Sequence, residues 1–255
     1  MENARECWFD ARRKTAVTVV DVTAAAQALA SSHLAGPVSA RFLAEGLAAA
    51  ALFGAETSEP DEVVSIQMKC EGPLGGYNVE CTADGRLRGY TEKKVLEDFD
   101  GLGPGDPRQI VGKAAYQVTR SVPGRILAQG VAATLEAYLA GSLQRKATLQ
   151  LEAAVSDEVE VKFARGILVE ELPDAEPTGA LGVKLRTLAV SSRKLLGGLG
   201  LAAAELKRTD ALAFGCRCSR ERAAAMLGAL GEEELQTLPR PAVVTCHMCG
   251  RTFSV

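Results

Sequence analysis

Four cysteines near the C-terminus form two close pairs. Cys216 and Cys218 make a C-x-C unit, and Cys246 and Cys249 make a C-x-x-C unit after 27 intervening residues. Zinc in structural sites takes four ligands in a tetrahedron, with thiolate sulfur at about 2.3 Å. Side chains two residues apart on extended chain share a face, and a tight C-x-x-C turn can also offer two sulfurs to one ion. The spacing therefore predicts one Zn²⁺ bound by these four cysteines, in a closed site that does not favour catalysis.

The segment between the two pairs is expected to form a small helical insert. Ser219 is a typical N-cap for a helix that runs through Leu230. Gly231 would end this helix, and the glutamates at 232–234 would open a second short one. Such a segment is too small to fold alone, whereas zinc binding to a small structural site contributes about 10–16 kcal/mol. We therefore expect zinc loss to unfold this segment, while a separate N-terminal core survives.

The C-x-C pair also suggests sensitivity to oxidation. A disulfide between residues i and i+2 closes a small strained ring, and strained disulfides are the labile, regulatory kind. Arg217, Arg220 and Arg222 add positive charge that favours thiolates. The spacing leaves two alternatives open, a permanent structural zinc knuckle and a releasable one.

The rest of the chain carries alternating helix and strand signals. The patterns predict helices at 22–33, 37–54 and 131–143, and strands at 63–69, 77–82, 86–90, 149–151 and 159–169. The spacing Tyr77-x-Val79-x5-Gly85 returns as Tyr116-x-Val118-x5-Gly124, which predicts two hairpins of one design. A duplication and a coincidence both explain this repeat.

Composition changes near residue 172 and divides the chain. A segment rich in proline, acidic residues and glycine begins at Pro173, and an aliphatic, basic segment with three glycines follows. We predict an α+β class with a mixed α/β core at 1–172, a helical linker at 173–209 and a zinc-binding domain at 210–255.

Net charge and hydropathy argue against nucleic acid and membrane as binding partners. The net charge is −3 and the sequence pI about 5.6, so the basic surplus of a nucleic-acid-binding protein is missing. The N-terminus lacks an apolar signal region, and the apolar stretch at 42–55 looks too short for a bilayer. We expect a cytoplasmic protein with neither membrane nor nucleic-acid partner.

Two rival functions use the same cysteines. A zinc-ribbon-type nucleic-acid-binding module is the main alternative, and salt-dependent RNA or DNA binding would support it. A disulfide oxidoreductase using Cys246 and Cys249 is a third reading, but it lacks the thioredoxin-like context. The isolated Cys7, Cys70 and Cys81 are expected to act as small hydrophobes, and no other constellation predicts an enzyme.

The run Phe214-Gly-Cys-Arg-Cys-Ser-Arg-Glu-Arg222, followed by Cys246-His-Met-Cys-Gly250, resembles the zinc-binding end of the redox-regulated heat-shock protein 33 family. His33-Leu34-x-x-Pro37, Gly72-Pro73-Leu74 and Arg88-Gly89-Tyr90 are similar to upstream motifs of that family. The resemblance covers nearly the whole chain, most strongly at the C-terminus.

The resemblance implies an ATP-independent holdase chaperone, inactive while reduced and zinc-loaded. Oxidation would form disulfides Cys216–Cys218 and Cys246–Cys249, release zinc and unfold the zinc domain and linker. Exposed apolar surface would then bind unfolding client proteins, usually as a homodimer. This chain departs from the family at Leu143, where an acidic residue is usual, and in a linker rich in glycine and leucine.

Overall fold

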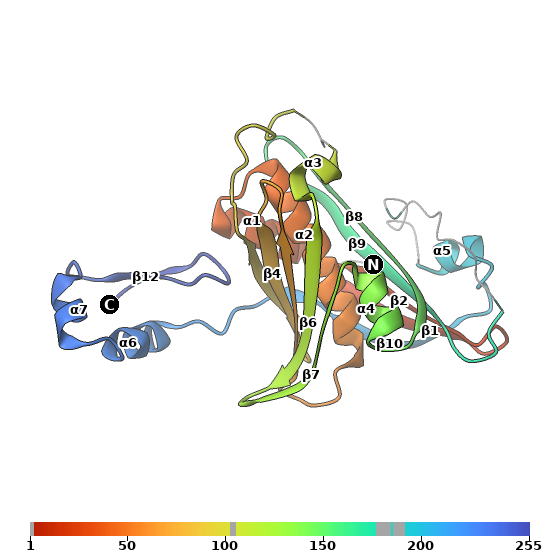
Figure 1. Cartoon of the computed structure of the whole chain (residues 1–255). Coiled ribbons are helices and arrows are strands. Elements are labelled where there is room, and N and C mark those ends of the chain that lie inside the picture. Colours follow the sequence, from red (N-terminus) through yellow and green to blue (C-terminus); the bar gives the residue numbers. More distant parts are fainter. Residues whose placement is uncertain (1–2, 103–105, 177–184, 186–191) are drawn as a thin grey trace.

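The computed structural model describes residues 3–102, 106–176, 185 and 192–255. Two sheets lie on either side of a long central helix, α2 (Pro37–Phe53) (Figure 1); all their strand pairs are antiparallel except the short parallel pair of β11 with β5. Nearly every residue of α2 is buried, because the helix packs on both sheets. The architecture is α+β, as predicted from the sequence.

The first sheet has five strands in the order β10-β1-β2-β9-β8. Its strands are β1 (Ala4–Asp10), β2 (Thr15–Asp21), β8 (Lys146–Val155), β9 (Val161–Glu171) and β10 (Glu205–Ala211). One face packs on α2, and the opposite, outer face carries a second apolar cluster. This cluster comprises Trp8, Val17, Val19, Ile167 and Val169 from the sheet, with Leu185, Leu195, Leu196, Leu201 and Ala204 over them.

The second sheet has six strands in the order β11-β5-β4-β3-β6-β7. Its strands are β3 (Val63–Cys70), β4 (Gly76–Thr82), β5 (Arg86–Thr91), β6 (Ala114–Val122), β7 (Arg125–Ala132) and β11 (Ala213–Phe214). The two predicted hairpins are β4–β5 and β6–β7, and they flank β3 from opposite sides. Tyr77 and Tyr116 both pair with Met68. The repeated spacing therefore reflects two equivalent registers, and duplication stays an interpretation.

Further helices belong to the two-sheet core. They are α1 (Thr23–His33), α3 (Pro107–Val111), α4 (Leu135–Gly141) and the 3₁₀ turn η1 (Gly54–Glu56). Pro37 occupies the first turn of α2, as predicted, where its missing N–H removes no helical hydrogen bond. The helix expected at 131–143 is shorter than predicted. Val131 and Ala132 end β7, and the Thr134 hydroxyl caps α4 by accepting from the Ala137 N–H at 3.0 Å.

The stretch Pro37–Glu56 is long and apolar enough to cross a membrane, so the expectation that this part of the chain is too short was wrong. Most of it is buried between the sheets, as in the core helix of a water-soluble fold. Length and apolar composition alone therefore give weak evidence for a membrane span here.

The segment expected as a linker is only partly described. Much of it, including residues 181–184 and 186–191, lies outside the described residues. Its described part contains α5 (Ser192–Gly198), which agrees with a helical segment, and then the strand β10, which pairs with β1. The predicted boundaries at 172 and 209 stay a prediction.

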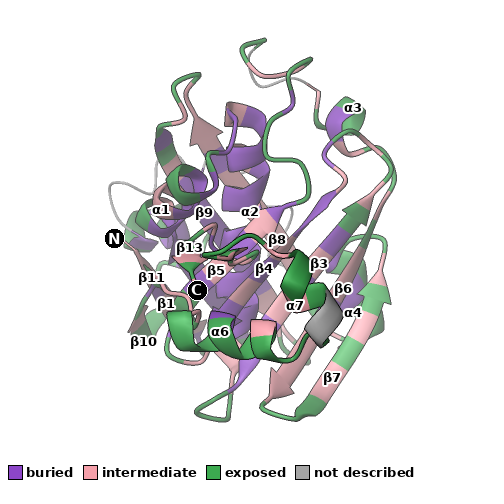
Figure 2. Cartoon of the chain, turned by 90° about the vertical axis from the view of Figure 1, so that its left-hand side faces the viewer, coloured by how far each residue is buried: buried purple, intermediate pink, exposed green. Residues whose placement is uncertain are grey.

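The C-terminal elements lie beside the core (Figure 1), in front of α1 and the second sheet in the view of Figure 2. They are α6 (Arg220–Gly228), α7 (Glu232–Thr237) and the two-stranded sheet of β12 (Val243–Thr245) and β13 (Thr252–Ser254). The two short helices predicted between the cysteine pairs are thus confirmed. The Ser219 hydroxyl caps α6 by accepting from the Arg222 N–H at 3.3 Å.

Candidate metal centre

The C-x-C half of the site is positioned by a core strand. β11 pairs in parallel with β5, and the Gly215 N–H donates to the Leu87 carbonyl at 3.0 Å. The chain then leaves the sheet edge and presents Cys216 and Cys218 before Ser219 starts α6. The core sheet and the helix cap therefore fix the backbone on both sides of this pair.

The C-x-x-C half is the tight turn between β12 and β13. The Cys249 and Gly250 N–H groups both donate to the Cys246 carbonyl, at 3.3 and 2.8 Å. Gly250 has a φ of 72°, and a Cβ there would meet the Ser32 carbonyl oxygen at 2.4 Å. Glycine is thus required both by the turn and by its contact with the core.

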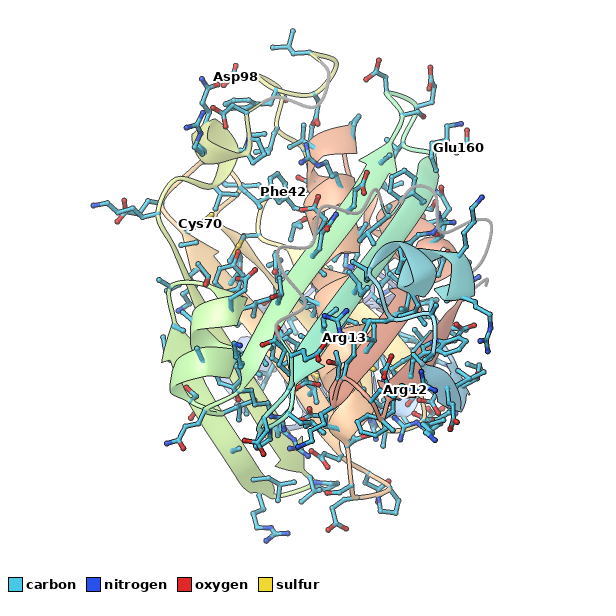
Figure 3. All side chains as sticks on the ribbon, turned by 90° about the vertical axis from the view of Figure 1, so that its right-hand side faces the viewer. Arg12, Arg13, Phe42, Cys70, Asp98 and Glu160 are labelled. Carbon is cyan, nitrogen blue, oxygen red and sulfur yellow. The ribbon has the colours of Figure 1, made fainter. Side chains whose placement is uncertain are left out.

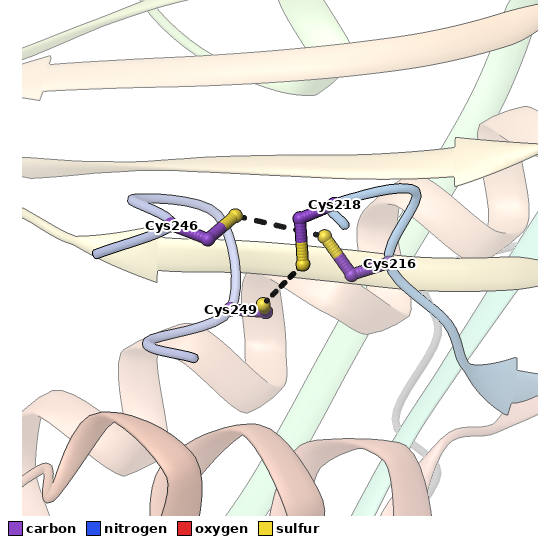
Figure 4. Close-up of side chains that lie close together, drawn as sticks. All are labelled: Cys216, Cys218, Cys246 and Cys249. Atoms are coloured by element: carbon purple, nitrogen blue, oxygen red, sulfur yellow. Dashed lines mark hydrogen bonds between the residues drawn. The ribbon is translucent and has the colours of Figure 1, made fainter. Parts of the chain in front are cut away.

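These two halves bring all four sulfurs within 4.8 Å of one another (Figure 4). The Cys216 and Cys246 sulfurs are 3.8 Å apart, and those of Cys218 and Cys249 are 3.5 Å apart. A tetrahedral zinc site with Zn–S of about 2.3 Å has S–S edges of about 3.8 Å. The four cysteines therefore have the donor set and spacing that a zinc ion requires.

Arg88 links the core to the C-x-C pair. Its guanidinium Nη1 lies 3.8 Å from the Cys216 sulfur. Its Nε and Nη2 donate to the Glu80 carboxylate at 2.7 and 2.6 Å. Both side chains of this ion pair are largely buried. The carboxylate holds the guanidinium rigidly beside the sulfur, so its positive charge can offset thiolate charge.

The C-x-x-C turn docks on the same strand and on the end of α1. The Gly89 N–H donates to the Met248 carbonyl at 3.1 Å, and the Ser32 hydroxyl donates to the Cys249 carbonyl. Buried His33 lies 2.9 Å from the Gly89 carbonyl through its Nε2. His247 packs edge-on against Tyr90, with ring centroids 4.1 Å apart. Three consecutive residues, Arg88 to Tyr90, thus contact both halves of the cluster.

The surroundings give Cys216, Cys218 and Cys249 different thiol pKa values in the metal-free chain. Partial burial opposes ionisation of Cys216, but hydrogen bonds from the Cys218 N–H, Arg88 and neighbouring cysteines lower the pKa of its thiol to about 7. Burial, together with hydrogen bonds to the cysteine partners, raises the pKa of Cys218. Burial also raises the pKa of Cys249. Cys216 is therefore the thiol most readily ionised among these three.

A cavity of about 430 Å³ opens beside the cluster. Cys218 and Cys246 contribute to its wall, together with Arg88, Met226 and Phe253. Cys249 is fully buried, whereas the other three cysteines are partly exposed. A small solute can therefore reach the cluster from this side.

The sequence identified the four cysteines but missed their partners in the core. Arg217, Arg220 and Arg222 were expected to favour the thiolates, yet they contact Glu80, the Ser254 carbonyl and the Arg217 carbonyl, respectively. Arg88 approaches sulfur instead. The Arg88-Gly89-Tyr90 and His33 motifs were the only sequence signals for this interface.

The remaining cysteines lie away from the cluster. Cys81 is fully buried, and burial raises the pKa of its thiol to about 11. Cys70 is half-buried and its pKa is also raised by burial. Cys7 is half-buried, with Arg208 Nη2 at 3.8 Å from its sulfur. Burial of Cys81 agrees with a role as a small hydrophobe.

The sequence model of the family described as Hsp33 protein matches residues 9–255. The chain belongs to the Hsp33 family. It is 29% identical to the 33 kDa chaperonin of Cyanothece sp., over 87% of this chain and 83% of that protein. It is 30% identical to the 33 kDa chaperonin of Symbiobacterium thermophilum, with the same two shares.

A solved structure supports the Hsp33 fold over the whole chain. The crystal structure of the 33 kDa chaperonin (heat shock protein 33 homolog) of Thermotoga maritima matches with a TM-score of 0.78. The match covers 99% of this chain and 94% of that one, at 17% sequence identity. At this identity the likeness establishes the Hsp33 fold alone.

Proposed function

We propose that this chain is a redox-regulated, ATP-independent holdase that prevents the aggregation of unfolding proteins. In the reduced protein Cys216, Cys218, Cys246 and Cys249 hold one Zn²⁺, and the chaperone is inactive. The observation that carries the proposal is the approach of four sulfurs within 4.8 Å in a member of the Hsp33 family. The zinc, when bound, supplies the binding energy that keeps the C-terminal segment folded.

Oxidation would remove the metal ligands in pairs. Two thiolates of one pair lose one electron each and form an S–S bond, while one H2O2 takes both electrons and two protons and leaves as two water molecules. Two peroxides would convert the cluster into disulfides Cys216–Cys218 and Cys246–Cys249. Two sulfur contacts run between the halves, at 3.8 Å from Cys216 to Cys246 and at 3.5 Å from Cys218 to Cys249. This pairing therefore rests on the family resemblance.

The outer face of the five-stranded sheet is a suitable surface for clients. Trp8, Val17 and Ile167 lie there beneath Leu196 and Leu201, all of them buried. The guanidinium of Arg193 stacks over the Trp8 ring at 5.1 Å. If loss of zinc releases β10 and α5, this apolar face becomes accessible to unfolded chains.

One experiment tests the switch directly. Peroxide or hypochlorous acid is added to the reduced, zinc-loaded protein, and zinc release is followed with a metal-sensitive dye. Suppression of the aggregation of a thermally unfolding client is measured in the same samples. We expect zinc release and suppression to rise together. Zinc release with no gain in suppression contradicts the chaperone proposal, and full suppression by the reduced protein contradicts the redox switch.

We propose unfolded client proteins as the partners, a homodimer in the oxidised state, and action in the cytoplasm without a nucleic-acid partner or enzymatic turnover. Light scattering coupled to size exclusion would test the dimer. A salt-dependent gel shift of RNA or DNA by the reduced protein would instead favour the nucleic-acid alternative.

A further inference from the structure

A row of three charged side chains crosses the five-stranded sheet at one end of its apolar outer face. Arg165 on β9 is the strand partner of Asp21 on β2 and of Glu152 on β8. Arg165 Nε donates to Asp21 Oδ2 at 2.8 Å, and both side chains are at least nine-tenths buried. Beyond this row on the same face lie the apolar side chains of Val19 and Ile167.

The backbone of Leu185 is hydrogen-bonded to two of these charged side chains. The Leu185 N–H donates to Glu152 Oε2 at 2.8 Å, and Arg165 Nη1 donates to the Leu185 carbonyl at 3.2 Å. The Leu185 side chain is fully buried in the apolar cluster. In the view of Figure 3 the helix α5, next along the chain after residues 186–191, lies over the same face of the sheet.

We infer that Asp21, Arg165 and Glu152 form a peptide-binding subsite, occupied here by Leu185. Its ligand is a single aliphatic residue of an unfolded polypeptide, bound through its own N–H and C=O and through its side chain. We call the three charged residues and the adjoining apolar surface the Leu185 seat. The inference rests on the proposed function, because clients reach the seat only after Leu185 and α5 have left this face of the sheet.

The chemistry of the seat fits a chaperone that accepts many sequences. Every residue except proline offers an N–H and a C=O, so these two hydrogen bonds do not depend on sequence. Both involve a charged partner, and such bonds are stronger than neutral ones. The ion pair with Asp21 positions the Arg165 guanidinium before a ligand arrives. Selectivity then comes only from the apolar side chain, a feature exposed when proteins unfold.

A peptide from this chain provides a defined probe. A fluorescein-labelled peptide with the sequence of residues 181–189 is titrated into the oxidised full-length protein, and binding is followed by anisotropy. We expect Leu185→Ala in the peptide to weaken binding on the order of tenfold, because most of the apolar side chain is lost. Methylation of the nitrogen of this leucine should weaken it comparably, because the N–H bond to Glu152 is lost.

Variants of the full chain assign the binding to the seat. Glu152→Ala should weaken the peptide on the order of tenfold, whereas the exposed Glu158→Ala should leave its affinity unchanged. Leu185→Gly in the protein should strengthen binding, because the competing residue of the chain itself is gone. An unfolded client should displace the peptide.

The outcomes separate the two proposals. If the oxidised protein suppresses aggregation but the peptide does not bind, is indifferent to Glu152→Ala, or is not displaced by client, the Leu185 seat is wrong and the holdase proposal stands. If oxidation releases zinc without any suppression, the holdase proposal fails. Peptide binding by the Leu185→Gly protein that Glu152→Ala weakens would still support the seat in that case.

Discussion

Arg88 is a core residue that lies beside the four-cysteine cluster although it is distant from the cysteines in the sequence. Its charge lies 3.8 Å from the Cys216 sulfur and is held there by Glu80. Four thiolates around Zn²⁺ carry a net charge of −2, so a buried cation beside them is stabilising. The spacing of the cysteines predicted the four donors, because ligand geometry is local. It could not predict Arg88, because its approach depends on how β5 and β11 pair.

The first prediction concerns this contact. Arg88→Gln should weaken zinc binding on the order of tenfold, as expected when an outer partner of a ligand is removed. Competition with a chromogenic chelator measures the affinity. Arg86→Gln is the matched control, because this neighbouring arginine is exposed and pairs with Asp84. Equal affinities of the two variants would show that Arg88 does not act on the site.

A second residue-scale prediction concerns pH. In the zinc-free reduced protein, the pKa of Cys216 is lowered to about 7, whereas an ordinary thiol titrates near ~8.5. In the native arrangement of the zinc-free protein, before the C-terminal segment unfolds, alkylation of Cys216 by iodoacetamide should therefore rise with a midpoint near pH 7, and Cys249, whose pKa is raised, should require higher pH. Mass spectrometry of timed digests measures each rate. A common midpoint for both cysteines would contradict this.

The lowered pKa of Cys216 also makes the stability of the metal-free fold depend on pH. The folded form binds fewer protons than the unfolded form between the two pKa values. The resulting stabilisation is present above the ordinary thiol pKa and is lost as the pH falls through about 7. Thiol ionisation at this position therefore stabilises the metal-free fold in mildly alkaline solution.

At the scale of elements, β10 joins the C-terminal third of the chain to the first sheet by pairing with β1. The Arg5 side chain, 2% exposed, donates to the Asp210 carboxylate through Nε and Nη2, both at 2.8 Å. Arg5 Nη1 also donates to the Ala51 carbonyl of α2 at 3.0 Å. The pair thus connects β1, β10 and the central helix.

Asp210→Asn should destabilise the protein by about 3 kcal/mol, because it leaves a buried guanidinium without its counter-charge. Urea unfolding followed by circular dichroism gives the difference in unfolding free energy. Asp174→Asn serves as the control. Its pair with Lys14 is exposed and spans 3.4 Å, so its removal should cost less than about 1 kcal/mol. Similar losses for both variants would mean that β10 contributes little to stability.

Local patterns predicted two of the hairpins whose strands are close in sequence. The β4–β5 and β6–β7 hairpins were found because their turns and repeated spacing lie within one short stretch. The strand β10 was missed, because Glu205 pairs with Phe9 across most of the chain. The local hairpin of β1 and β2, in which Phe9 pairs with Ala16, was also missed, because its turn at 11–14 contains no glycine, asparagine or proline to signal it. The three-residue strands β12 and β13 are too short for any periodicity to show.

At the scale of the whole molecule, the zinc site and the core should separate on metal removal. Without zinc, α6, α7 and the β12–β13 sheet have few buried residues to stabilise them. Treating the reduced protein with a chelator should therefore make residues beyond 215 sensitive to protease, while both large sheets persist. Limited proteolysis with mass mapping tests this, and the zinc-loaded protein is the control. Simultaneous cleavage throughout the chain would show that core and zinc site unfold as one unit.

The pairing of β1 with β10 also has a consequence for biosynthesis. The ribosome makes β1 first, and 196 residues separate Phe9 from its partner Glu205. At roughly 5–20 residues per second, the edge of β1 waits about 10–40 s for its neighbour. During this time α5 is also missing, so Trp8 and the surrounding apolar face are uncovered in every nascent chain. The growing polypeptide therefore exposes this face before α5, which packs on it in the folded chain, has been made.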